Sequence, residues 1–169
     1  MTLGIDLSSD VISFSYLQDK VIKTCYIDDS LGYRTDSLFN DKNELYLILK
    51  KVKNYAESIT NSNFNNTVIA IPWYCNYMQT KNLRNAVKKC DMLLLRTNSA
   101  NEFASVAIAQ SIHFDSSNYA ANLFLCTINS DYAEFSLISS DDVIEHFGSI
   151  TIKYSLNENI DIIKKRVNT

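Results

Sequence analysis

The chain has 169 residues, of which 46% are apolar and 21% are charged, and its formal net charge is −3. This length is enough for a single domain with a buried core, and an acidic balance without a basic cluster argues against nucleic-acid binding. No apolar run is long enough to span a membrane, and the N-terminus has no signal-peptide pattern. The sequence therefore predicts a cytoplasmic protein that binds neither membranes nor nucleic acids.

The cysteines are too scattered for a metal site or a disulfide framework, because no two of them form a C-x-x-C pair and only two histidines are present. We expect reduced thiols in or near the core. No internal repeat is apparent in the sequence.

The first 60 residues read as three strands and a helix. Alternation of apolar and polar residues predicts strands over 2–8, 11–17 and 20–27, with Asp6 near the first turn. A variable connection over 28–40 follows. The next segment places apolar residues on one helical face and begins with capping residues. These residues are Asp41 and Glu44 at the start, then Leu45, Ile48, Leu49, Val52, Ala56 and Ile59.

The next strand, 67–71, is ended by Pro72, the only proline. Asn76 with Gln79 three residues later is the pattern of a capping box, which predicts a helix over 76–90. Trp73 and Tyr74 are expected to close the core, and a surface anchor for a partner is the alternative for Trp73. The remaining predicted elements are a strand at 92–96, a helix at 101–112, strands at 121–127, 132–139 and 142–153, and a helical tail at 157–167.

The order and spacing of these segments resemble the first lobe of the ATPase domain of seventy-kilodalton heat-shock chaperones, which belong to the actin-like ATPase superfamily. Four stretches carry the resemblance: Gly4-Ile5-Asp6-Leu7, Ile71-Pro72-Trp73-Tyr74-Cys75-Asn76 with Gln79, Asn101-Glu102-Phe103-Ala104-Ser105-Val106-Ala107, and Asn157-Glu158-Asn159-Ile160-Asp161. The resemblance implies an α/β fold of the ribonuclease H-like type, with a mixed central sheet flanked by helices. It further implies one lobe over 1–156 with a shortened insertion at 28–40, a helical tail over 157–169, and no second lobe.

The phosphate loops depart from the family pattern. Ser8-Ser9-Asp10 stands where the family has Gly-Thr-Thr, and 127–132 replaces Asp-Leu-Gly-Gly-Gly-Thr. Glycine lets backbone N–H groups approach phosphate oxygens, and side chains now occupy that space. Asp10 and Asp131 would also repel a polyphosphate by about 1 to 4 kcal/mol per pair of unit charges near 4 Å. The segment that carries the family's catalytic lysine is missing, so we expect a pseudo-ATPase without a bound cofactor.

If a nucleotide or metal is bound at all, the resemblance assigns it to Asp6, Ser8, Ser9 and Glu102, with Asp6 as the metal ligand and ATP or ADP with Mg²⁺ as the cofactor. Asp6 and Glu102 also have a structural interpretation. Asp6 can hold the following turn, and Glu102 can form a capping box with Ser99.

The leading expectation is therefore a catalytically inactive chaperone-ATPase-like lobe that acts as a protein-interaction module. Its partner would be a chaperone, a ribosome-associated complex or a chain that supplies the second lobe, and a homodimer is a further alternative. Two other functions stay open. One is half of a split nucleotide-binding ATPase, and the other is a metal-dependent nuclease that uses Asp6, Glu102 and Asp131 around two ions about 4 Å apart.

Overall fold

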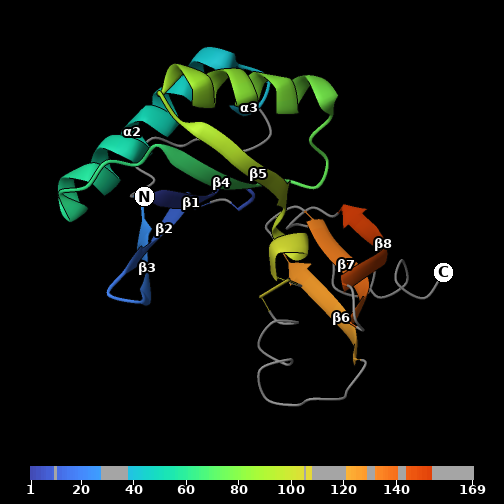
Figure 1. Cartoon of the computed structure of the whole chain (residues 1–169). Helices are drawn as coiled ribbons and strands as arrows, with labels where there is room; N and C mark the ends of the chain where they lie inside the picture. Colours follow the sequence, from blue (N-terminus) through green and yellow to red (C-terminus); the bar gives the residue numbers. More distant parts are fainter. Residues whose placement is uncertain are drawn as a thin grey trace. The chain divides into compact units, whose positions relative to one another are not determined.

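The computed structural model describes residues 1–9, 11–27, 38–104, 106–107, 121–128, 132–140 and 144–153 (Figure 1). The chain forms two compact units, Met1–Ala100 and Asn101–Thr169, and each is described by itself. The fold is α/β, as predicted, and the first unit has a five-stranded mixed sheet flanked by helices. None of the helices in the described ranges is both long and apolar enough to cross a membrane.

The sheet of the first unit has the strand order β3-β2-β1-β4-β5. Its strands are β1 (Thr2–Asp6), β2 (Ser13–Gln18), β3 (Val21–Tyr26), β4 (Asn66–Ile71) and β5 (Leu93–Ser99). The pairs β1–β2 and β2–β3 are antiparallel, whereas β1–β4 and β4–β5 are parallel. Only β2 therefore runs against the other four strands. Asp19 and Lys20 connect β2 to β3 with φ of 51° and 63°, the backbone of a tight two-residue hairpin.

Two helices, α2 (Lys42–Thr60) and α3 (Tyr77–Lys89), lie on one face of this sheet (Figure 1). The sheet residues that point toward them are buried because strand side chains alternate between faces. These buried residues include Leu3, Ile5, Phe14, Tyr16, Thr67, Ile69 and Ile71. The helices contribute the other half of the core with Leu45, Ile48, Leu49, Val52 and Ala56 from α2 and Leu83, Ala86 and Val87 from α3.

The caps predicted from the sequence are present at both helix starts. The Asp41 carboxylate accepts hydrogen bonds from the backbone N–H groups of Asn43 and Glu44, at 2.8 and 3.3 Å. Asn76 and Gln79 form a reciprocal capping box, with bonds of 3.0 and 2.9 Å. These bonds satisfy N–H groups that have no partner within the helix.

The opposite face of the sheet carries mainly small and polar side chains around β1, and exposed Leu17, Ile22 and Tyr26 on β2 and β3. Two rows cross it in register: Thr24, Ser15, Gly4, Val68 and Arg96, then Tyr26, Ser13, Asp6, Ala70 and Asn98. The hydroxyls of Ser15 and Thr24 share a hydrogen bond of 2.8 Å across this face. We call this surface the open face.

The second unit contains a short helical segment at 101–104 and 106–107 and an antiparallel sheet of β6 (Ala121–Ile128), β7 (Tyr132–Ser140) and β8 (Ile144–Lys153). One face of this sheet is closed at Ser136, which is fully buried. The Asn101 side-chain amide donates to the Ser136 hydroxyl at 3.1 Å, which ties the helical segment to this face.

The two sheets share a repeat that the sequence did not reveal. The residues paired between β1 and β2 include Gly4–Ser15, Ile5–Phe14 and Asp6–Ser13. The residues paired between β6 and β7 include Leu125–Ser136, Cys126–Phe135 and Thr127–Glu134, so each member lies 121 positions further along the chain. In both sheets the third strand then pairs antiparallel with the second. We call β1–β3 the first meander and β6–β8 the second meander.

Most predicted elements are confirmed to within a few residues. The strand predicted at 92–96 instead runs from Leu93 to Ser99, because its polar end continues to pair with β4. Trp73 is 38% exposed, so its expected place in the core is wrong; its ring meets that of Tyr74 edge-on at 5.9 Å. Most of the connection at 28–40, the end of the helix predicted at 101–112, and the tail at 157–169 fall outside the described residues. The single lobe over 1–156 stays a prediction.

The capping box of α3 can be tested by Asn76→Ala. We expect the free energy of unfolding to fall by about 1 kcal/mol, because the N–H of Gln79 loses its acceptor. Urea denaturation measures this change. Asn85→Ala is the matched control, since Asn85 is exposed on the same helix and alanine there should raise stability by about 0.5 kcal/mol. Equal losses for both variants would contradict the assignment of the cap.

Candidate functional site

The carboxyl ends of the parallel strands β1, β4 and β5 lie at one edge of the first sheet, which is where open α/β sheets usually bind ligands. Asp6 is the last residue of β1 and lies on the open face. It shares a row with Ser13, Ala70 and Asn98. Adjacent strands are about 4.8 Å apart, so the backbones of Asp6 and Asn98 are separated by roughly 10 Å.

The carboxylate of Asp6 is engaged by the loop that follows it. Its Oδ1 accepts two hydrogen bonds from Ser8, one from the backbone N–H at 2.8 Å and one from the hydroxyl at 2.6 Å. The N–H of Leu7 donates to the carbonyl of Ala70 at 2.9 Å, which extends the pairing with β4 one residue beyond β1. This geometry agrees with the structural interpretation of Asp6, in which its carboxylate stabilises the following turn.

Ser9 and Glu102, the remaining predicted site residues, have other surroundings. The Ser9 hydroxyl donates to the carbonyl of Val11 at 2.8 Å and thus also serves the turn. Ser8 is buried, so its side chain fills part of the loop. Glu102 is half-buried in the helical segment of the second unit, whereas Asp6, Ser8 and Ser9 belong to the first. Asp10 and Asp131 lie outside the described residues.

In the row of described residues that contains Asp6, this side chain is the one carboxylate. In the row that contains Asp6, the neighbouring polar side chains are a hydroxyl and an amide. Within the ranges that the structure describes, no three side chains of His, Cys, Asp or Glu gather as a metal site would need. Sequence reasoning missed Ser13, Arg96 and Asn98 on the open face, because their convergence depends on strand order.

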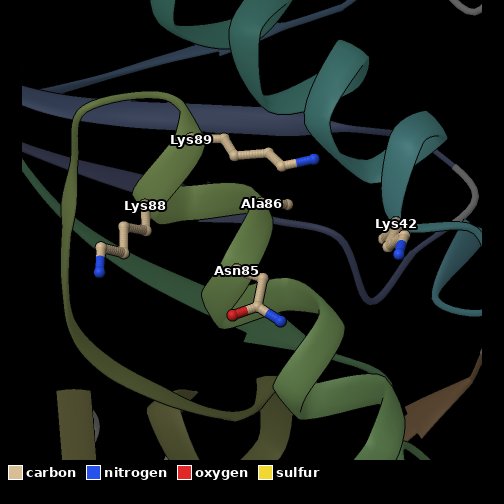
Figure 2. A pocket seen from close by; sticks show the side chains of 5 residues that line it. All are labelled: Lys42, Asn85, Ala86, Lys88 and Lys89. Carbon is tan, nitrogen blue, oxygen red and sulfur yellow. The ribbon is translucent and has the colours of Figure 1, made fainter.

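A second candidate is a hollow of about 450 Å³ at the helix layer, lined by Lys42, Asn85, Ala86, Lys88 and Lys89 (Figure 2). Lys42 begins α2, while Lys88 and Lys89 lie in the last turn of α3, where cations stabilise the helix dipole. Figure 2 shows the side chains of Lys88 and Lys89 pointing in different directions. The ammonium groups therefore do not converge on one anion.

The lysines on this layer have structural roles. Lys50 and Lys89 both lie over the ring of Tyr46, with Nζ 5.5 and 5.9 Å from its centroid. Lys53 donates to the carbonyl of Cys90 at 2.9 Å, which ties α2 to the end of α3. Lys50, Lys53 and Lys89 thus make contacts within the helix layer.

The free cysteines differ in environment: Cys90 is buried, Cys25 and Cys75 are half-buried, and Cys126 is exposed. Cys25, Cys75 and Cys90 match the expectation of thiols in or near the core. For Cys126 the expectation is wrong, because this residue is exposed. Burial raises the pKa of Cys75, in the turn after β4, from an ordinary value of 9.0 to about 12.

Comparison with known proteins gives no relative, since no family model matches the chain and no curated protein matches it.

The Asp6–Ser8 interaction can be tested by Ser8→Ala. We expect a loss of about 1.5 to 3 kcal/mol in the free energy of unfolding, because a hydroxyl that donates to a carboxylate is removed from a buried position. Ser9→Ala serves as the control, and its more exposed bond to Val11 should contribute less than about 1 kcal/mol. Urea denaturation of both variants measures the two losses. A larger loss for Ser9→Ala would show that Asp6 does not organise this loop.

The raised pKa of Cys75 predicts a pH dependence of stability. Between pH 9 and 12 the thiol is protonated in the native state but ionised in the unfolded chain, so the native state binds more protons and stability falls as pH rises. The slope is at most about 1.4 kcal/mol per pH unit. Cys75→Ala should show a smaller loss between pH 8 and pH 10.5 than the unsubstituted chain. Cys126→Ala, which removes an exposed thiol, should show no such difference.

Proposed function

We propose that the chain is a degenerate lobe of the actin-like ATPase type, similar to that of seventy-kilodalton heat-shock chaperones, and that it acts as a protein-interaction module rather than an enzyme. The strand order β3-β2-β1-β4-β5, with β2 alone reversed, supports a ribonuclease H-like fold. The capping box of α3 falls within the stretch that most resembles the chaperones.

The observation that carries this proposal is the double hydrogen bond from Ser8 to the Asp6 carboxylate. In a phosphate loop the backbone N–H groups must be free to face phosphate oxygens, and glycine makes room for them. Here the N–H of Ser8 is directed to a carboxylate, and its side chain occupies the loop.

A fold that has lost its loop chemistry can persist because its surface binds other proteins. The partner would then be a chaperone, a ribosome-associated complex or a chain that supplies a second lobe, in the cytoplasm. A homodimer is the other arrangement that would cover an exposed apolar surface.

One observation favours a second candidate, half of a split nucleotide-binding ATPase. The second meander repeats the register of the first, as the start of a second lobe of the same fold would. The remaining strands and helices of that lobe would come from another chain. Nucleotide would bind only after both lobes meet.

Titration of the purified chain with ATP and ADP in Mg²⁺, followed by calorimetry, tests the leading proposal. We expect no saturable heat at millimolar nucleotide and no thermal stabilisation. Binding in the micromolar range that weakens by tenfold or more in Asp6→Asn would overturn it and favour the split ATPase. Incubation with an RNA–DNA hybrid and Mn²⁺ tests the nuclease alternative, and we expect no cleavage.

A further inference from the structure

Strand β3 forms one edge of the first sheet, because it pairs with β2 and stands at the end of the strand order. The N–H of Ile27 donates to the carbonyl of Ile12 at 2.9 Å, so these residues continue the β2–β3 ladder as a hydrogen-bonded pair. Hydrogen-bonded and non-hydrogen-bonded pairs alternate along an antiparallel ladder. The backbone groups of Ile22, Thr24 and Tyr26 therefore point away from β2, toward the outer side of the edge.

This edge lacks most of the features that prevent strands from associating. Among the residues that the structure describes, no strand pairs with the outer side of β3. Native sheets usually protect their edges with proline, a bulge or charged side chains. β3 contains no proline, pairs with β2 without a register shift, and has one charged residue, Lys23. The other edge strand, β5, pairs with β4 through an irregularity at Thr67 and Val68. β3 is thus the edge better suited to accept another strand.

The side chains of β3 are exposed together with its backbone. Val21, Ile22 and Tyr26 are 52%, 71% and 70% exposed. Ile22 and Tyr26 lie on the open face, whereas Val21 lies on the face that carries the helices. A strand beside β3 would cover side chains on both faces and also satisfy the outward backbone groups. A helix laid on either face would leave those backbone groups without partners.

A second copy of β3 is a strand that fits this edge. A two-fold axis perpendicular to the sheet reverses the strand direction and keeps the helices of both copies on one side, so residues of the same face oppose each other. With Thr24 opposite Thr24 of the second copy, Ile22 lies opposite Tyr26. These are the residues whose backbone groups point outward, and each such pair can exchange two hydrogen bonds. The pairing also places two exposed apolar side chains in contact across the axis.

The same register suits the other face of the strand. It places Val21 opposite Ile27, and Lys23 opposite Cys25, so apolar side chains again meet and no like charges oppose each other. A register displaced by two residues toward the β2–β3 hairpin would instead place Lys23 opposite Lys23 of the second copy, which is destabilising. The sequence of β3 is therefore complementary to itself in one particular register.

We propose that the chain forms a two-fold symmetric dimer in which β3 pairs antiparallel with β3 of a second copy, with Thr24 at the axis. The two five-stranded sheets then become one continuous sheet. This inference rests on the proposed role as an interaction module and specifies a second copy of this chain as the partner.

Sedimentation equilibrium of the full chain tests the dimer, and Thr24→Pro tests its interface. Proline is tolerated in an edge strand where the N–H faces away from the sheet, so the β2–β3 hairpin should persist and circular dichroism should be unchanged. We expect dimerisation to weaken by about tenfold or more, because the hydrogen bonds at the axis are lost. Thr24→Val is the matched control, since it keeps the backbone N–H, and it should remain a dimer.

Oxidative cross-linking tests the register. Thr24→Cys should form a covalent dimer, because residues in a hydrogen-bonded pair have Cα atoms about 5.5 Å apart, within the range of a disulfide. Ile22→Cys is the control at another exposed position of β3. In the proposed register the two copies of residue 22 are roughly 13 Å apart, which a disulfide does not span. Non-reducing electrophoresis compares both variants with the unsubstituted chain.

Three results would overturn the proposal. A chain that stays monomeric at all concentrations would show that β3 does not pair with a second copy. A dimer that Thr24→Pro leaves intact would assign association to another surface. Covalent dimers formed equally by Ile22→Cys and Thr24→Cys would contradict the register. All these measurements are made without nucleotide, so they fail or succeed separately from the calorimetric test of the proposed function.

Discussion

The first unit depends on the central position of β1, which pairs with β2 on one side and β4 on the other. Its side chains alternate between the helix layer and the open face, so Leu3 and Ile5 are buried while Gly4 and Asp6 are not. A shift of one residue in either pairing would reverse these faces and expose the apolar residues. The burial of β1 against α2 and α3 thus fixes the register of the sheet and, with it, the place of Asp6.

The loop after β1 is organised by the carboxylate of Asp6. The carboxylate of Asp6 stays at the edge where parallel strands end, but Ser8 satisfies it with two hydrogen bonds. Such bonds stabilise the turn, and they direct a backbone N–H away from any ligand.

The two meanders share a register yet differ in how they are covered. In the first, aromatic and aliphatic side chains meet α2, whereas in the second the corresponding side chains are exposed. The hydrophobic effect favours covering them, at about 25 cal/mol per Å² of apolar surface removed from water.

Much of the fold follows from the sequence because its signals are local. The alternation in β1 and β2, the apolar stripe of α2 and the capping box at Asn76 each depend on residues close together in the chain. Asp6 could likewise be placed at a strand end. Its two possible roles, ligand and turn anchor, could not be separated, because the choice depends on the direction of the Ser8 side chain.

Only the tertiary structure decided which distant residues meet. Asn98 joins the row of Asp6 through β4, and the polar end of β5 is a strand solely because β4 pairs with it. The repeat between the meanders was hidden because few positions keep the same residue: Ser15 and Ser136 agree, whereas Leu3 becomes Phe124 and Ile5 becomes Cys126. Trp73 was misplaced for a related reason: its aromatic character predicts burial, but only packing determines whether the core has room for it. Local sequence patterns thus determined where the helices and strands form. Long-range strand pairing determined which face of a sheet each side chain lies on, because that face depends on neighbours far away in the sequence.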